Sequence, residues 1–218
     1  MLLITDRQLA EVGKKTFEDR MVAHLRGLSA PPSRMVAEVQ LRSMLRLGVA
    51  RAGARGFTFR GPVRLYLELM LLLGSHFDTD PQYPWCAEIL ARADSASQMQ
   101  RAEALYRKSL DYWNAVAGPE NAHVYAALRR IRTLVRQPPT FTREAFIQAM
   151  AVEIVQVYPQ KAACLGAHGV DSVIRAGILA ARASSLTSLR GFALMTMLVL
   201  AFGHGCAGIR CTNGSSGY

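Results

Sequence analysis

Apolar side chains recur along this chain at the three- and four-residue spacing of α-helices, and Pro and Gly separate the stretches that carry this pattern. The first stretch opens with Thr5-Asp6-Arg7-Gln8, which fits a helix-capping box. No stretch alternates apolar and polar residues in the way that a half-buried strand does. The pattern therefore predicts an all-α fold. The expected helices cover about residues 5–28, 33–56, 61–74, 85–93, 95–117, 119–136, 142–158, 166–184 and 189–202.

Two of the expected helix pairs share a sequence pattern. Leu41–Phe77 and Val170–Cys206 each contain a helix of small residues around a Gly, a turn with Thr and Arg-Gly, and an apolar helix that closes on Gly. An offset of 129 residues, the separation of Phe17 from Phe146, aligns the two copies without gaps as far as Gly203. This repetition predicts a duplicated helical unit, although two unrelated amphipathic hairpins of similar composition would also produce it. The offset pairs identical residues at Phe17/Phe146, Met21/Met150, Ser43/Ser172, Arg46/Arg175, Gly48/Gly177, Ala52/Ala181, Ala54/Ala183, Thr58/Thr187, Leu65/Leu194, Leu69/Leu198, Leu71/Leu200 and Gly74/Gly203.

The architecture expected from this repetition is an all-α bundle or array built from two tandem pseudo-repeats. The clearest linker, Gln137-Pro138-Pro139-Thr140, marks the boundary between them. Residues 1–136 would form the first repeat with extra helices, and residues 137–218 a second, shorter repeat packed on the first. The last residues, which follow Gly203, lack helical periodicity and are expected to form a loose tail.

The composition is apolar for a chain without a long hydrophobic segment. Of the 218 residues, 50% are hydrophobic, and the mean hydropathy is +0.11. Such a chain buries a large core or exposes an apolar face that awaits a partner, and it is compatible with a homodimer. No apolar stretch reaches the roughly 18–20 residues that cross a bilayer, and the N-terminus lacks a secretory pattern. We therefore expect a cytoplasmic protein with no membrane span and with reduced cysteines.

The net charge of +10 is compatible with nucleic acid, an anionic lipid or an acidic protein as a partner. Only four of the 26 basic residues are Lys, and an Arg excess of this kind also arises from codon bias, which weakens the charge as a sign of nucleic-acid binding. Arg129, Arg132 and Arg136 fall on one face of an expected helix. That face can contact phosphates or an acidic protein, and we expect a protein.

No motif for catalysis or for a cofactor stands out in the sequence. There is no nucleophile elbow, no phosphate-binding loop and no dinucleotide-binding glycine pattern. His76, Asp78 and Asp80 alternate in one loop, but Asp is common in turns because it bonds to its own backbone. His204, Cys206 and Cys211, with Cys164 and His168, resemble a broken zinc site without two close ligand pairs. We expect no catalytic residues, no cofactor and no metal.

The loop after residue 74 combines acidic and aromatic side chains. Phe77, Tyr83 and Trp85 surround Asp78 and Asp80. Aromatic residues beside carboxylates on a loop are typical of a protein-binding hot spot. The alternative is that the aromatic rings fold inward and fix the loop to the core, which we favour for Trp85. The expected partner-binding residues are thus Phe77, Asp78, Asp80, Tyr83, Trp85, Arg129, Arg132 and Arg136.

The run LYLELMLLLGSHFDTDPQYPWCAEIL, which follows GVARAGARGFTFRG, resembles an uncharacterised family of helical bacterial proteins encoded near type VI secretion spike and effector genes. The resemblance covers Phe17 to Leu90 best and recurs weakly from Phe146 to Gly203, where Tyr158-Pro159-Gln160-Lys161 also fits. After Gly203 the chain departs from the pattern, because the second copy lacks the loop that follows the first.

The resemblance implies a cytoplasmic accessory protein that helps to load or neutralise an effector, and it brings no catalytic residues. Together with the repeat and the missing motifs, it leads us to expect a non-enzymatic adaptor or chaperone that binds a secretion effector or spike component. Two alternatives stay open. One is an immunity protein that blocks a secreted toxin, and the other is a basic regulator that binds nucleic acid.

Overall fold

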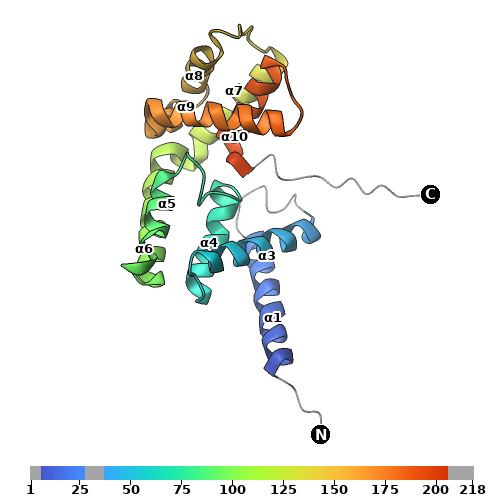
Figure 1. The fold of residues 1–218 in the computed structure, drawn as a ribbon, viewed down its shortest axis with the longest axis vertical. Coiled ribbons are helices and arrows are strands. Elements are labelled where there is room, and N and C mark those ends of the chain that lie inside the picture. Colours follow the sequence, from blue (N-terminus) through green and yellow to red (C-terminus); the bar gives the residue numbers. More distant parts are fainter. Residues whose placement is uncertain (1–5, 28–36, 206–218) are drawn as a thin grey trace, which may run out of the picture. The chain divides into compact units, whose positions relative to one another are not determined.

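The computed structural model describes residues 6–27 and 37–205, and all regular structure within them is helical (Figure 1). This confirms the all-α prediction. The expected cap at Thr5, the break near Pro31 and the tail from Cys206 lie outside the described residues. The helices are α1 (Asp6–Gly27), α3 (Glu38–Ala54), α4 (Arg60–Leu73), α5 (Pro84–Leu90), α6 (Gln98–Ala117), α7 (Ala122–Arg136), α8 (Phe146–Val157), α9 (Pro159–Ala183) and α10 (Leu189–Phe202), with 3-10 turns η1 (Arg92–Asp94) and η2 (Pro119–Asn121).

The chain divides into two compact units, but not at the predicted boundary. Unit 1 comprises Met1–Leu72 and Ala93–Ala102, and unit 2 comprises Leu73–Arg92 and Glu103–Tyr218. The expected boundary after residue 136 falls inside unit 2, because the apolar face of α7 packs into the same core as α8, α9 and α10. The Pro138-Pro139 segment therefore connects two helices of one unit.

In unit 1, α1 packs on α3, and α3 packs on α4. Leu25 of α1 and Leu41 and Leu45 of α3 are almost completely buried. Gly48 lets α4 approach α3 closely, since a Cβ atom at this position would overlap the side chains of Leu67 and Met70. The small residue in the middle of the helix thus serves the packing between the two helices.

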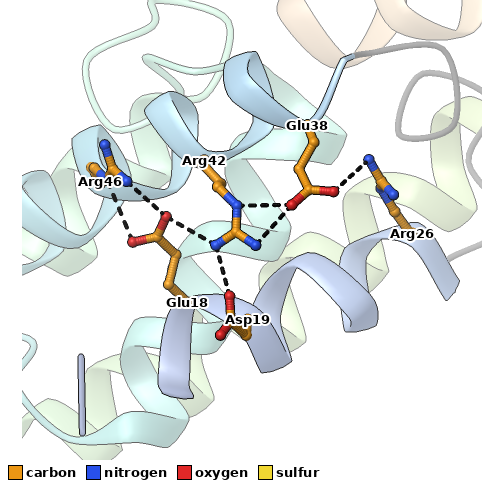
Figure 2. Close-up of polar contacts among 6 residues, drawn as sticks. All are labelled: Glu18, Asp19, Arg26, Glu38, Arg42 and Arg46. Carbon is orange, nitrogen blue, oxygen red and sulfur yellow. Dashed lines mark hydrogen bonds and ion pairs between the residues drawn. The ribbon is translucent and has the colours of Figure 1, made fainter. Parts of the chain in front are cut away.

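A polar seam joins α1 to α3 along the outside of unit 1 (Figure 2). The guanidinium of Arg42 donates to Asp19 Oδ1 at 2.8 Å and to Glu38 Oε1 at 2.8 and 3.0 Å. Donating to these two carboxylates raises the pKa of Arg42 above its ordinary value. The members of this seam are Glu18, Asp19, Arg26, Glu38, Arg42 and Arg46.

In unit 2, α9 packs against both α8 and α10, and α7 contacts α8 and α10 (Figure 1). Ile154 of α8, Val173 of α9 and Val199 of α10 are fully buried at the centre. Gly177 allows the close approach of α9 to α10, because a Cβ atom there would overlap both the backbone and the side chain of Thr196. The unit therefore has a continuous apolar core built mainly from sequence after residue 116.

At the 129-residue offset, both ends of α4 and α10 and the C-terminal ends of α3 and α9 match, whereas α9 begins earlier, at Pro159. Helix α4 spans Arg60–Leu73 and α10 spans Leu189–Phe202, while α3 and α9 end at Ala54 and Ala183. The turns match as well: the Phe57 and Leu186 amides donate to the Ala52 and Ala181 carbonyls, both at 2.9 Å. Gly56 and Ser185 take positive φ angles of 73° and 61° in these turns. Duplication stays a prediction, since unrelated hairpins with this turn would form the same bonds.

Candidate binding surface

The acidic and aromatic loop is folded into unit 2 instead of being presented on its surface. Phe77, Asp78, Asp80 and Tyr83 expose only 0%, 2%, 3% and 3% of their area, whereas Trp85 is partly exposed. Tyr83 and Trp85 both pack against the Tyr112 ring of α6. This corrects our assignment of the four buried residues to a partner-binding site, because their side chains are occupied within the core.

The loop closes the C-terminal end of α10. Gln82 Nε2 donates to the Val199 carbonyl at 2.9 Å, and Lys161 Nζ donates to the Leu200 carbonyl at 2.6 Å. Asp80 Oδ2 accepts the His204 amide at 2.8 Å, just after the helix ends. The last carbonyls of a helix have no partner of their own in the helical pattern. The Val199 carbonyl also accepts the Gly203 amide at 2.8 Å, whereas the Leu200 carbonyl accepts from Lys161. The loop therefore acts as a structural cap.

Burial and hydrogen bonding set the charges in this cap. Burial lowers the pKa of Lys161 to about 8, although the negative charge of Asp80 opposes the change. Burial alone would raise the pKa of Asp80, but hydrogen bonds from His204 and from the Gln82 amide outweigh it and hold that pKa below its usual value. Burial also raises the pKa of the Tyr83 hydroxyl and of the Cys86 thiol. None of these residues lines either of the two hollows on α7 described below.

Metal-ligating side chains do not converge in the part of the chain that the structure describes. No group of three or more His, Cys, Asp or Glu residues there is placed to hold an ion. His76 and His204 come together, with ring centroids 5.6 Å apart, and Asp80 Oδ2 lies 3.2 Å from His204 Nδ1. Cys206 and Cys211, part of the zinc-like pattern in the sequence, lie outside the described residues.

The other predicted residues, Arg129, Arg132 and Arg136, lie together on the exposed side of α7. The helix has this orientation because Ala127, Ile131 and Leu134 face the core of unit 2. None of the three guanidinium groups takes part in an ion pair within the described ranges, and α7 itself contains no Asp or Glu. The three arginines therefore form a stripe without an ion-pair partner in these ranges, and Glu120 is the acidic residue that lines one surface depression together with Arg129 and Arg132.

The neighbouring Arg130 has a different role. Its Nη1 donates to the Gln156 and Val157 carbonyls at 2.9 and 3.2 Å, which caps the end of α8. Arg130 therefore has a structural role, whereas Arg129, Arg132 and Arg136 point away from the core.

Exposed apolar side chains accompany the arginine stripe. Tyr125, Leu128 and Val135 of α7 expose 50%, 39% and 47% of their area. The first half of α7 borders an open depression of about 540 Å³, which is lined by Tyr125, Leu128, Arg129 and Arg132 among others. We call the surface formed by Tyr125, Leu128, Arg129, Arg132 and Arg136 the α7 face.

A second, smaller hollow lies beneath the second half of α7. It has a volume of about 100 Å³ and is enclosed by residues of α7, α8 and α10 and of the segment between α7 and α8. Its walls are almost entirely apolar. We call it the α7 pocket; it is lined by Leu134, Val135, Phe141, Met150, Leu194 and Met197, among others.

Comparisons with known proteins add nothing about function, so the α7 face and the α7 pocket are the main evidence for it. We found no family model, no curated protein and no solved structure that matches the chain. The resemblance to proteins encoded near type VI secretion genes thus stays a prediction. Within the described residues, every helix is too short or too polar to cross a membrane.

Proposed function

We propose that this chain is a non-enzymatic binding protein of the cytoplasm, an adaptor or chaperone that holds an acidic protein partner on the α7 face. The observation that carries the proposal is the stripe of Arg129, Arg132 and Arg136, which has no carboxylate partner in the described structure. Some exposed arginines on other helices do have such partners, although Arg182 of α9 and Arg190 of α10 have none within the described residues. Arg64, Arg107 and Arg175 each pair with a carboxylate one helical turn away.

The side chains between these arginines support a protein partner. Arg and Tyr are enriched in protein interfaces, where they combine a polar end with a large contact area. Tyr125 and Leu128 are exposed beside the arginines and would lose apolar surface to such a partner. A nucleic-acid backbone offers phosphates to the arginines but little apolar surface to Leu128, so it is the second candidate.

The resemblance in the sequence suggests what this partner is. A secreted effector or a spike component of a type VI system would make the protein a loading adaptor, and a toxin would make it an immunity protein. Rescue of cells from the toxin separates these two roles, because an adaptor that does not block the toxin gives no protection.

The proposal is tested by purifying the tagged chain from its native host before and after nuclease treatment. We expect a stoichiometric protein partner that survives nuclease and is lost from the triple variant Arg129→Gln, Arg132→Gln, Arg136→Gln. The matched control is Arg64→Gln, Arg107→Gln, Arg175→Gln, which removes the same charge from exposed, ion-paired positions. Recovery of nucleic acid alone, abolished by nuclease, would contradict the proposal.

A further inference from the structure

The α7 pocket opens at the surface beside the arginine stripe. Val135 of α7 and Leu194 of α10 both line the pocket and expose 47% and 40% of their area, so the pocket reaches the surface at these two residues, which we call its mouth. Arg190 of α10 also lines the pocket, and its Nη2 donates to the Val135 carbonyl at 3.5 Å. A cation therefore borders the mouth on the α10 side as well.

The spacing along α7 joins the pocket to the α7 face. Leu128, Arg132 and Val135 follow one another at intervals of four and three residues, which places them on successive turns of one side of the helix. Arg136 directly follows Val135 in the chain. A segment lying along this side of α7 would meet arginines and the mouth of the pocket within about one turn, or roughly 5.4 Å.

The pocket wall has little charge of its own. Glu153 is the one acidic residue and Arg190 the one basic residue among the described residues that line it. The rest of the wall is apolar or proline. An apolar side chain would lose water-exposed surface on entry against this wall, of which Glu153 and Arg190 are the two charged members.

The volume of the α7 pocket limits which side chain can bind in it. A cavity of about 150 Å³ is large enough for benzene. The α7 pocket, at about 100 Å³, is smaller, so it suits an aliphatic side chain better than an aromatic ring.

We infer that the α7 pocket receives one aliphatic side chain, of the size of Leu, Ile or Met, from an acidic segment of the partner protein. The carboxylates of that segment pair with Arg129, Arg132, Arg136 and Arg190. This inference rests on the proposed function and adds the recognition chemistry to it: an amphipathic segment with acidic residues and a single aliphatic anchor.

Other occupants fit less well. A second copy of this chain, bound face to face, would place arginine stripe against arginine stripe, and like charges in contact oppose association. Nucleic acid would satisfy the arginines but has no aliphatic side chain for the pocket. Both remain outcomes that the experiment can detect.

The test uses short helical peptides labelled with fluorescein and the full chain, with binding followed by fluorescence anisotropy. The first peptide carries glutamates on one face and a central leucine. In the second, serine replaces the leucine, in the third tryptophan replaces it, and in the fourth glutamines replace the glutamates. We expect the serine peptide to bind at least about tenfold more weakly than the leucine peptide, because burial of an aliphatic side chain is lost. The tryptophan peptide should also bind more weakly, because the indole is too large for the pocket.

Variants of the protein test the same contact from the other side. Leu194→Ser at the mouth should weaken the leucine peptide severalfold and leave the serine peptide unchanged. The control Leu179→Ser makes the same change at an exposed position of α9 that does not line the pocket, and it should have no effect. Because the peptide series uses the unaltered protein, the result does not depend on whether a variant folds.

The outcomes separate this inference from the proposed function. Equal binding of the leucine and serine peptides, still weakened by loss of the three α7 arginines, would overturn the pocket and keep the α7 face. Binding of a single-stranded oligonucleotide with no peptide binding would overturn both. Concentration-dependent dimerisation that Leu194→Ser abolishes would assign the pocket to a second copy and overturn the inference.

Discussion

The helix pairs α3–α4 and α9–α10 share a backbone pattern but differ where each meets the helix before it. At the 129-residue offset, His24, Arg64 and Glu68 of unit 1 match Glu153, Ala193 and Met197 of unit 2. In unit 1, Glu68 Oε1 lies 2.6 Å from His24 Nε2 and 2.8 Å from Arg64 Nε. In unit 2, the matching residues line the apolar α7 pocket. The same hairpin is therefore accompanied by a polar contact in unit 1 and by the mainly apolar walls of a pocket in unit 2.

The polar contacts of the two units also differ in their exposure. The seam between α1 and α3 includes Asp19, whose side chain is 48% exposed, whereas the Asp80 side chain in the cap of α10 is 1% exposed. A carboxylate in contact with water is replaced at little cost, while a buried one leaves its donors unpaired. The comparison therefore predicts that the same substitution, Asp to Ala, lowers the free energy of unfolding more in the cap of α10 than in the seam.

The largest expected effect comes from the pair Asp80→Ala and Asp19→Ala. Asp80→Ala leaves the Gln82 and His204 amides without their acceptor and should lower the free energy of unfolding by about 3 kcal/mol. Asp19→Ala should lower it by less than about 1 kcal/mol. Urea unfolding of both variants measures the difference, and equal losses would refute the contrast between a buried cap and an exposed seam.

The pH dependence of the unfolding free energy provides a second test of the contrast between the buried cap and the exposed seam, and it depends on Lys161. Its pKa of about 8 in the folded chain lies below the ordinary value of 10.5, so the unfolded chain binds the proton more tightly. The folded state is therefore penalised below pH 8, and the penalty disappears as pH rises toward 10.5. The unfolding free energy of the unaltered chain should rise over this window relative to Lys161→Met, by up to roughly 3 kcal/mol.

Cys86 and Tyr83, whose pKa values burial raises, act in the opposite direction at high pH. They are present in both proteins, so their effect largely cancels when the two pH profiles are subtracted; Tyr83, whose hydroxyl accepts from Lys161 Nζ at 3.5 Å, cancels least. A flat difference profile between pH 8 and 10.5 would show that Lys161 is not a buried ammonium.

The close helix contacts provide a third pair, Gly177→Ala and Gly48→Ala. A Cβ atom at 177 meets the Thr196 backbone, whereas one at 48 meets only the side chains of Leu67 and Met70. We expect Gly177→Ala to destabilise the protein by about 1–3 kcal/mol. Gly48→Ala should be milder, because flexible side chains move aside and alanine favours the helix. Thermal unfolding compares them, and a larger loss at 48 would reverse the argument.

The smallest expected effect is that of Arg42→Gln in the exposed seam. It should lower the urea midpoint slightly at low salt, because three carboxylates lose their common partner. At about 1 M salt the screening length falls to about 3 Å, and the difference from the unaltered chain should vanish. A loss that persists at high salt would mean that packing, not charge, holds the seam together.

The sequence predicted the helices well because their ends carry direct signals. Gly61-Pro62 and Gly74 bracketed α4, and the bounds expected for α10 agree with those observed. The domain boundary failed because Pro138-Pro139 breaks a helix without separating two cores. Whether a linker divides two cores depends on the packing of distant helices, which local sequence does not contain.

The candidate site was predictable only in part. Helical spacing placed Arg129, Arg132 and Arg136 on one exposed face, as observed. The burial of Asp78 and Asp80 was not foreseen, because acidic turn residues usually face water and the His204 amide that donates to Asp80 comes from far along the chain. The α7 pocket was missed because its walls come from α7, α8, α10 and a connecting segment that meet only after folding.

The central claim is that the α7 face binds an acidic protein segment. The most direct measurement is the affinity of the glutamate–leucine peptide, across a series of salt concentrations, for the unaltered chain and for the two triple arginine variants. The claim predicts that affinity falls with salt for the unaltered chain and the control variant, and that the variant lacking Arg129, Arg132 and Arg136 loses most of it. Equal losses in the two triple variants would contradict the claim, because net charge alone would then explain binding.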